Sequence, residues 1–518
     1  MALNRISKSM IDADFVQSVE DTTNDLRQRE VNIKQPPFNL KEDGTNEQSV
    51  LLSALQYAAD NHYTLFIPKA VKVLVDSVTL AGKQNFGIRC EGTIKRIDSS
   101  PTVGAMLKLD GCSDVSIKEV NFDGNGLNNG CVEDVAYTSA QEQKHSLILL
   151  NCNRVSFGKF DVLNPCGDGI YLSGNTKNLQ IDRLLGKADK RIGRNLISII
   201  NAQNIFINYM ESDGIGHYDM PGGFDIEPNG ASEIVKNVFV NSMNIRSGGS
   251  NILSVLNTNG STVENVLIDK ANIISDSVVN PNPTCVILAG QSVTVNQLIM
   301  DGGGKADLIK VDTWDDASKT KNITVRKAVG KNGYRGLLLG FNRQVLNVDI
   351  KATFTNCGFD GVALFWVKGA KLDLDIDSVK SDRFMINAAP GVGTLEDVTI
   401  SGNISKRGTG LKAIISTADP SKIINWTLKD LDFTGWTNDT RLYGGGLQGS
   451  IRKINCPNLT HMPSLPNFDN YKQGDVIWNT GTDNNVAFWR RLTNGTGNAL
   501  NTDWKRTKTT QWNKLCGR

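Results

Sequence analysis

The segment GIYLSGNTKNLQI, residues 169–181, contains two short runs in which apolar and polar residues alternate, joined by a turn of Gly, Asn and Thr. Alternation with a period of two is typical of β-strands, and Asn and Gly are typical of turns. Segments of the same form recur along the chain, among them NLISIINAQNIFI at 195–207 and GLLLGFNRQVLNVDI at 336–350. The sequence therefore predicts repeated pairs of strands.

The second strand of each pair has a simple form, apolar-x-apolar, usually after Asn or Asp. Copies begin at Asp114, Arg154, Asn178, Asn204, Asn237, Asn265, Asn296, Asn322, Asn347, Lys371, Asp397 and Asn425. After a first step of 40 residues the spacing is 24 to 33 residues, which indicates one coil of a solenoid per copy. Because each coil holds at least two strands and the signature of a leucine-rich repeat is missing, we predict an all-β fold, a right-handed single-stranded parallel β-helix.

The ends of the repeat region differ from its middle. Residues 45–61, TNEQSVLLSALQYAADN, predict a capping helix that begins with a Thr45–Gln48 capping box and buries Leu51, Ala54, Leu55 and Ala58. After residue 435 short strand signals lie between turns rich in Asn, Gly and Thr. We predict a neck or attachment segment at 1–30, a capping module at 31–105, the β-helix at 106–435 and a small β domain at 436–518.

Composition excludes several classes of function. The 518 residues carry 56 basic and 54 acidic side chains, so a net charge of +2 gives no electrostatic footprint for nucleic acid or an anionic membrane. The amino terminus lacks the apolar core of a signal peptide, and no window is long and apolar enough to span a membrane. The protein is therefore expected to be made in a cytoplasm.

Nine cysteines are scattered without a C-x-x-C pair, which favours buried free thiols over a disulfide framework or a zinc site. No group of aspartates convincingly forms a calcium site either. We expect no metal and no cofactor.

Two regions resemble known modules. The segment from Phe38 to Lys69, with Asp43-Gly44, the capping helix and Phe66-Ile67-Pro68, resembles the opening module of the pectate-lyase-like superfamily. The tail, GDVIWNT…FWRRLTNGTG…TDWKR, resembles the module that ends many bacteriophage tailspikes. The resemblance covers nearly the whole chain and points to tailspikes of the capsule-depolymerase kind. It implies a homotrimer on the phage tail, bound to other tail proteins, that recognises and cleaves bacterial capsular polysaccharide and is released by lysis of the host.

The segment GGFDIEPNG, residues 222–230, contains two carboxylates one residue apart. If Phe224 and Ile226 point inward, alternation turns Asp225 and Glu227 outward on one face, where a polymer can reach them. Glycoside hydrolysis uses a pair of carboxyl groups, and the spacing of a pair at i and i+2 on a strand weakly favours inversion. We interpret Glu227 as the acid and Asp225 as the base, although outward acids on such strands are also simple surface decoration.

The residues around this pair are candidates for binding the substrate. The coil that carries the pair includes MESDGIGHYDMPGG, which we expect to be a loop, and the preceding coil includes KRIGRN. Trp314, beside acids in VDTWDD, suits sugar stacking at a distal subsite. Asp168 is interpreted as a bend residue. The predicted substrate-binding residues are Arg191, Arg194, Glu211, Asp213, His217, Tyr218, Asp219 and Trp314.

Two other functions stay open. A polysaccharide lyase needs a base and a cation or arginine beside a uronic acid, and Arg191, Arg194, His217 and Tyr218 meet that need. A spike that only binds its receptor needs no reactive carboxylates.

Overall fold

The structure is a computed structural model. It describes residues 29–432, apart from 278, 281–282, 314–318, 378, 380–382, 392, 405–412 and 418. Beyond them it describes the six strands at 442–443, 451–454, 461–462, 476–479, 486–491 and 504–508. The chain divides into two compact units, Met1–Ile299 and Met300–Arg518. Each is described separately.

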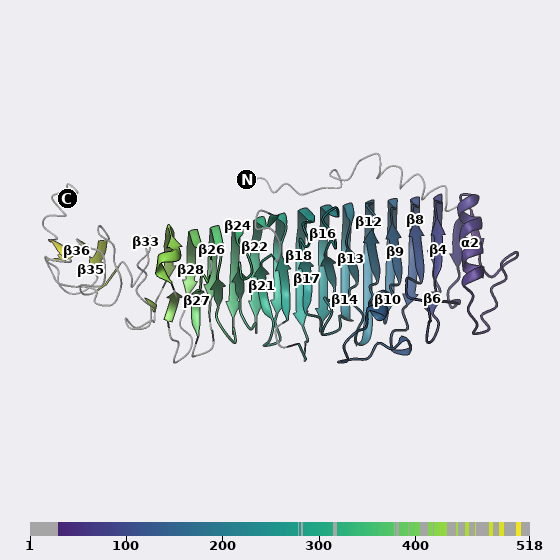
Figure 1. The fold of residues 1–518 in the computed structure, drawn as a ribbon, viewed down its shortest axis with the longest axis horizontal. Coiled ribbons are helices and arrows are strands. Elements are labelled where there is room, and N and C mark those ends of the chain that lie inside the picture. Colours follow the sequence, from purple (N-terminus) through teal and green to yellow (C-terminus); the bar gives the residue numbers. More distant parts are fainter. Residues whose placement is uncertain are drawn as a thin grey trace. The chain divides into compact units, whose positions relative to one another are not determined.

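Unit 1 is built from two sheets whose strands alternate along the chain and pair in parallel with the next coil (Figure 1). This arrangement confirms the predicted parallel β-helix. The first sheet, sheet A, contains β1 (Glu30–Asn32), β2 (Thr64–Ile67), β3 (Lys72–Val75), β5 (Gln84–Cys90), β6 (Thr93–Arg96), β8 (Ser113–Asp123), β10 (Asn153–Leu163), β12 (Thr176–Ile192), β14 (Ala202–Ile215), β16 (Ile234–Ser247) and β18 (Thr262–Ser275). Sheet B contains β4 (Val78–Ala81), β7 (Leu107–Asp110), β9 (Leu147–Leu150), β11 (Ile170–Ser173), β13 (Ile197–Ile199), β15 (Phe224–Ile226), β17 (Asn251–Val255) and β19 (Thr284–Leu288).

The repeated Asn of the sequence has a physical role. Asn178, Asn204, Asn237 and Asn265 all have a positive φ, between 55° and 59°, which Asn tolerates better than most residues. Their side chains also form a ladder, in which the amides of Asn204, Asn237 and Asn265 donate to the side-chain oxygen of the equivalent Asn one coil earlier, at 2.8 to 3.3 Å. The amide of Asn178 donates to Asn153 at 2.9 Å. The residue therefore bends the chain near the start of each of these sheet-A strands and links neighbouring coils.

The same feature corrects two predicted repeat positions. In the copy assigned to Asn296 the residue with positive φ is Ser292, and in the copy assigned to Lys371 it is Gly369. The apolar pattern alone is satisfied at more than one offset within a strand, which is why the predicted register is wrong in these two coils.

The core of unit 1 consists of apolar columns that run from coil to coil. Leu179, Ile205, Val238 and Val266 occupy successive paired positions, and all four are buried. Because every coil contributes the same inward positions, burial of these columns fixes which side chains must face outward.

The predicted capping helix is present as α2 (Gln48–Asp60), which packs against β2, β4 and β5 (Figure 1). Leu51, Ala54, Leu55 and Ala58 are buried, as predicted. The predicted capping box is wrong. The helix begins after Glu47 without a side-chain cap, and the Thr45 hydroxyl instead donates to Asp43.

A long connection follows β8 in unit 1. It contains a 3₁₀ turn, η2 (Leu127–Asn129), and the short helix α3 (Ser139–Glu142), which has a true capping box formed by Thr138 and Gln141. This insertion accounts for the first step of 40 residues in the repeat.

Unit 2 repeats the two-sheet coil. Its strands equivalent to sheet A are β22 (Lys321–Lys331), β24 (Val345–Thr355), β26 (Val367–Ile376), β28 (Leu395–Ile404), β30 (Ile423–Ile424), β31 (Trp426–Asp432) and β33 (Ile451–Ile454); those equivalent to sheet B are β21 (Asp307–Val311), β23 (Leu337–Leu339), β25 (Val362–Leu364), β27 (Phe384–Ala388), β29 (Ala413–Thr417) and β32 (Leu442–Tyr443). β20 (Gln291–Asp301) contains the division between the units, and the short helix η4 covers Pro420–Lys422.

Four further strands of unit 2 form a separate small sheet. They are β34 (His461–Met462), β35 (Val476–Asn479), β36 (Val486–Arg491) and β37 (Trp504–Lys508), with antiparallel pairing of β36 to both β35 and β37. The domain boundaries at 30, 105 and 435 remain predictions, and residues 1–28 of the predicted neck lie outside the described residues.

Seven cysteines lie in the described part of the chain, and all seven are buried free thiols, as predicted. Within the same residues no helix has both the length and the apolar character of a membrane span.

Candidate active site

A glycine-rich segment brings the chain into β15. Gly223 has a φ of +101°, and a Cβ there would lie 2.6 Å from a side-chain carbon of Ile245 and 2.9 Å from the Ile252 carbonyl oxygen. Only glycine suits such a position. Phe224 and Ile226 then point into the core, so the intervening Asp225 and the following Glu227 face the other way.

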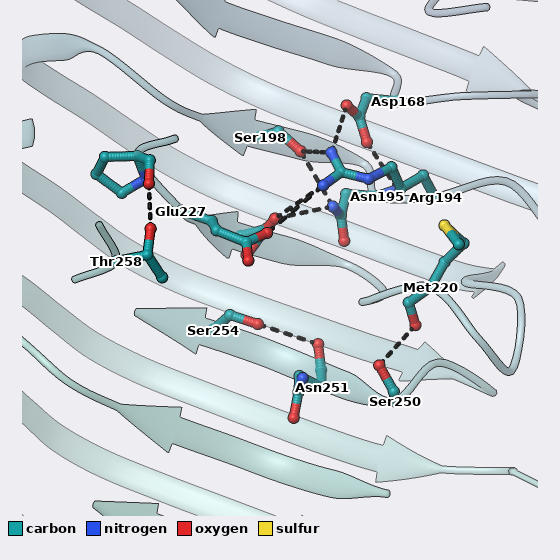
Figure 2. A network of polar contacts seen from close by, with 12 residues as sticks. Asp168, Arg194, Asn195, Ser198, Met220, Glu227, Ser250, Asn251, Ser254 and Thr258 are labelled. Carbon is teal, nitrogen blue, oxygen red and sulfur yellow. Dashed lines mark hydrogen bonds and ion pairs between the residues drawn. The ribbon is translucent and has the colours of Figure 1, made fainter. Parts of the chain in front are cut away.

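The guanidinium group of Arg194 lies close to three carboxylates (Figure 2). Arg194 donates from Nη1 to Asp168 Oδ2 at 3.2 Å, and its Nη2 lies 3.5 Å from Glu227 Oε2 and 3.9 Å from Asp225 Oδ2. The two predicted catalytic acids thus lie against the same side of one arginine. They come from one coil, whereas Arg194 and Asp168 come from the two preceding coils.

Neighbouring polar groups hold this cluster in place. The Asn195 backbone N–H donates to Asp168 Oδ1 at 3.1 Å, and the Asn195 amide donates to Asp225 Oδ2 at 3.2 Å and to Ser198 Oγ at 3.0 Å. His145 Nδ1 lies 3.1 Å from Asp168 Oδ2 and accepts the Asp168 backbone N–H. Asp168, Asn195, Ser198 and His145 are all buried, so the groups behind the carboxylate pair are rigidly packed.

The surroundings shift the carboxyl groups in opposite directions. Burial raises the pKa of Asp225 well above its ordinary value, and the adjacent Glu227 raises it further, against the opposing effect of Arg194. Burial also raises the pKa of Glu227, again opposed by Arg194. Burial acts in the same direction on Asp168, but Arg194 and His145 outweigh it and hold its pKa below the ordinary value.

Only one member of the pair is exposed. The side chain of Glu227 is 29% exposed, whereas Asp225 has no exposed surface. The expectation that a polymer can reach both acids therefore holds for Glu227 and is wrong for Asp225. The reason is that Asp225 lies in the middle of a paired strand, between Ser198 and Ser254 of the adjacent strands, while Glu227 follows the end of the strand.

Several of the predicted substrate-binding residues instead contact the insertion between β8 and β9. Arg191 Nη2 lies 3.1 Å from Glu133 Oε1 and 3.3 Å from Asp134 Oδ2. The Tyr137 backbone N–H donates to Asp219 Oδ2 at 3.0 Å. Arg191 and Asp219, which the sequence predicts to bind a substrate, therefore pair with residues of the insertion.

The predicted His217 is buried in the same region. Its Nδ1 pairs with Asp219, and its ring stacks on Tyr137 at 4.7 Å between centroids. Tyr218 lies beside it, with ring centroids 4.5 Å apart, and its carbonyl oxygen accepts the Asn280 amide at 3.1 Å.

Two other predicted residues lie in a different place from the one expected. Glu211 and Asp213 belong to β14 of sheet A, where they are exposed, and the loop begins only after Ile215. The strand continues because Met210 and Ser212 alternate with these acids as buried positions. Trp314, the predicted distal subsite, lies outside the described residues.

The sequence reasoning missed Asp168 as a site residue, and missed Asn195, Ser198 and His145 altogether. A signal for two of them exists in the register, since Asp168 and Asn195 each stand two residues before the paired positions Ile170 and Ile197. Within the described residues no group of His, Cys, Asp and Glu side chains has the arrangement of a metal site.

Comparison with known proteins yields matches only to solved structures. No protein-family model and no curated protein matches the chain. Endo-xylogalacturonan hydrolase from Aspergillus tubingensis is 13% identical, with a TM-score of 0.30, over 81% of this chain and 95% of the other. Tailspike protein 3 of bacteriophage CBA120 is 10% identical, with a TM-score of 0.41, over 89% and 67%. The family 28 exopolygalacturonase of Yersinia enterocolitica is 12% identical, with a TM-score of 0.40, over 72% and 78%. At these identities and TM-scores the comparisons carry no conclusion about the function of this chain.

Proposed function

We propose that this protein is a tailspike depolymerase that binds bacterial capsular polysaccharide and hydrolyses its glycosidic bonds at Asp225 and Glu227. The observation that carries the proposal is a pair of carboxyl groups that lie against one arginine, one buried and one partly exposed, with the pKa of both raised by burial. Such a pair retains a proton closer to neutrality than an ordinary carboxylate does. The sequence resemblance supports the remainder: a homotrimer attached to phage tail proteins.

The exposure of the pair suggests the roles. Glu227 is the member that can reach a glycosidic oxygen, so it donates the proton to the leaving group. Asp225 is the base that activates a water molecule in the inverting reaction that the spacing weakly favours. Because Asp225 has no exposed surface, this role requires substrate binding to open a path for water to its carboxyl group. Arg194 keeps the charge of the cluster balanced while the proton leaves Glu227, because its guanidinium faces both acids.

The test is incubation of the full chain with purified capsular polysaccharides from a panel of strains. A fall in polymer size with new reducing ends and no new ultraviolet absorbance supports hydrolysis. An unsaturated uronate, seen as new absorbance, would instead identify a lyase. If no polymer is shortened although one is bound, the protein is a receptor-binding spike.

A variant links the reaction to the site. Glu227→Gln keeps the shape of the side chain but cannot donate the acidic proton, and it should still bind the polymer that the unmodified protein cuts. Cleavage at an undiminished rate by this variant would remove Glu227 from the mechanism.

A further inference from the structure

Unit 2 carries a column of aromatic and guanidinium groups that the proposed reaction does not use. Tyr334, Phe359 and Arg383 each stand three residues before a paired position of β23, β25 and β27, so they lie on successive coils. The Tyr334 and Phe359 rings are stacked, with centroids 4.8 Å apart and planes 20° from parallel. The Arg383 guanidinium carbon lies 3.7 Å from the centroid of Phe359.

Arg335 lies alongside this column. Its guanidinium carbon is 4.8 Å from the Tyr334 centroid and 5.1 Å from the Phe359 centroid. Both oxygens of Asp307 contact a single nitrogen, Nη1, at 3.1 and 3.3 Å, so the pair does not use the two-nitrogen fork of the guanidinium. Among the described residues the buried Nε of Arg335 has no hydrogen-bond partner. The ion pair thus involves Nη1, one of the two terminal nitrogens of the guanidinium, while the buried Nε lies out of a ligand's reach.

The acids Asp307 and Asp360 of this cluster are more deeply buried than Arg335. Asp360 is 1% exposed and accepts hydrogen bonds from the Phe384 backbone N–H at 3.3 Å and the Asn387 amide at 2.9 Å. The Asp307 side chain is 11% exposed, while that of Arg335 is 21% exposed. The acids therefore lie beneath the surface, and the partly exposed groups are the two arginines and the two aromatic rings.

Polar residues of this cluster occupy the same position within the coil as polar residues of the candidate active site in unit 1. Asp307, Arg335 and Asp360 stand two residues before the paired positions Ile309, Leu337 and Val362. Asp168 and Asn195 have the same offset in their own coils. In unit 1 three carboxylates surround one arginine, whereas here arginines and aromatic rings predominate at the surface.

We propose that Tyr334, Arg335, Phe359 and Arg383 form a binding site for an acidic saccharide. A uronate carboxylate would accept hydrogen bonds from the guanidinium groups, and the apolar C–H face of the sugar would contact the aromatic side chains. The stacked rings hold the guanidinium planes in place before the ligand arrives, which lowers the ordering cost of binding. The proposal rests on the proposed function only in taking the ligand to be a saccharide, and it requires no cleavage.

Calorimetry on the full chain tests this site. Short oligomers of galacturonic acid are titrated into the Glu227→Gln variant, which prevents turnover, and the same oligomers with methyl-esterified carboxyl groups serve as the neutral ligand. We expect the acid to bind at least about tenfold more tightly than the ester, and increased salt to weaken it. Arg335→Gln with Arg383→Gln should weaken binding of the acid by about tenfold or more, while Arg343→Gln, on an exposed arginine of the same unit, should not.

Melting curves of each variant show whether it is folded. If Arg335→Gln unfolds the unit, Arg335→Lys keeps a cation beside Asp307 but removes the planar fork, and it should also lose affinity. No binding of the acid, equal binding of the ester, or unchanged affinity in the folded arginine variants would overturn the site. Release of reducing ends from capsular polysaccharide by the unmodified protein is measured separately, so failure of cleavage and failure of this site are distinguishable.

Discussion

Unit 1 contains two clusters of acids and bases that use the same kinds of residue and differ in how their charges are paired. In the carboxylate cluster, Asp168, Asp225 and Glu227 surround the single guanidinium of Arg194. In the loop cluster, which comprises Glu133, Asp134, Tyr137, Arg191, His217 and Asp219, the arginine and the histidine each pair with acids of the cluster. The carboxylate cluster has more carboxylates than cations, whereas the loop cluster joins two segments of the chain through ion pairs.

This difference indicates which cluster is suited to chemistry. Burial, together with the neighbouring carboxylates, raises the pKa of Asp225 and Glu227, and Glu227 is partly exposed and can give up a proton. Charged groups that are already paired with each other can bind a substrate only after that ion pair is broken. We therefore expect substitutions in the carboxylate cluster to act mainly on the reaction and those in the loop cluster mainly on stability.

The largest expected effect is on the rate. Glu227→Gln should reduce the rate of depolymerisation by at least about 100-fold, because it removes the proton donor. Asp219→Asn is the matched substitution in the loop cluster and should change the rate by less than about tenfold. The measurement is the initial rate of release of reducing ends. Equal losses in the two variants would erase the distinction between the clusters.

The second expected effect is on folding. Arg194→Met should lower the free energy of unfolding by about 3 kcal/mol or more, because it leaves Asp168 buried without its cation. Arg191→Met removes a guanidinium from partly exposed acids, and it should cost about 1 kcal/mol or less. Urea unfolding measures both.

Adding Asp168→Asn to Arg194→Met should restore part of the lost stability, since the buried charge is then removed. Failure of the second substitution to help would mean that Arg194 stabilises the fold by packing and not by charge.

The sequence predicts the two-sheet coils well because the same inward positions recur in every coil and must be apolar. It predicts Asp225 and Glu227 as neighbours on one side of a strand for the same reason. It does not predict that Asp225 is covered, because that outcome depends on the adjacent coils. Nor does it predict that Arg191 and His217 are engaged, because their partners belong to the insertion after β8. The register of the strands is predicted only in part, because a pattern of apolar residues does not reveal the positive φ at Ser292.

The third expected effect is a dependence of stability on pH. The folded pKa values of Asp225 and Glu227 lie above their unfolded values, so the folded state binds protons more tightly. Their contribution to stability is complete below about pH 4, the ordinary carboxyl range, and is lost as the pH rises through the raised values. Asp168 contributes with the opposite sign, because its pKa is lowered, and its contribution is lost as the pH falls.

Asp225→Asn isolates the first contribution. The variant should unfold with a free energy that declines less between about pH 4 and pH 8 than that of the unmodified protein. The difference between the two curves cancels titration elsewhere. Tyr137→Phe in the loop cluster serves as the control for a general effect of substitution, because it removes no group that titrates between about pH 4 and pH 8. Parallel curves for Asp225→Asn and the unmodified protein would contradict the raised pKa of the pair.

The smallest expected effect concerns the link between the two clusters. The phenol oxygen of Tyr137 accepts the backbone N–H of Gly193, the residue immediately before Arg194, while the Tyr137 ring stacks on His217. Tyr137→Phe keeps the ring and removes the hydrogen bonds of the phenol to Gly193 and to the Cys131 side chain, so it should lower the free energy of unfolding by about 1 to 2 kcal/mol. Because Arg194 is held independently by Asp168 and Ser198, the rate of cleavage should change by less than about tenfold. A larger loss of rate, with stability unchanged, would show that the loop cluster positions the arginine and that the two clusters act as one site.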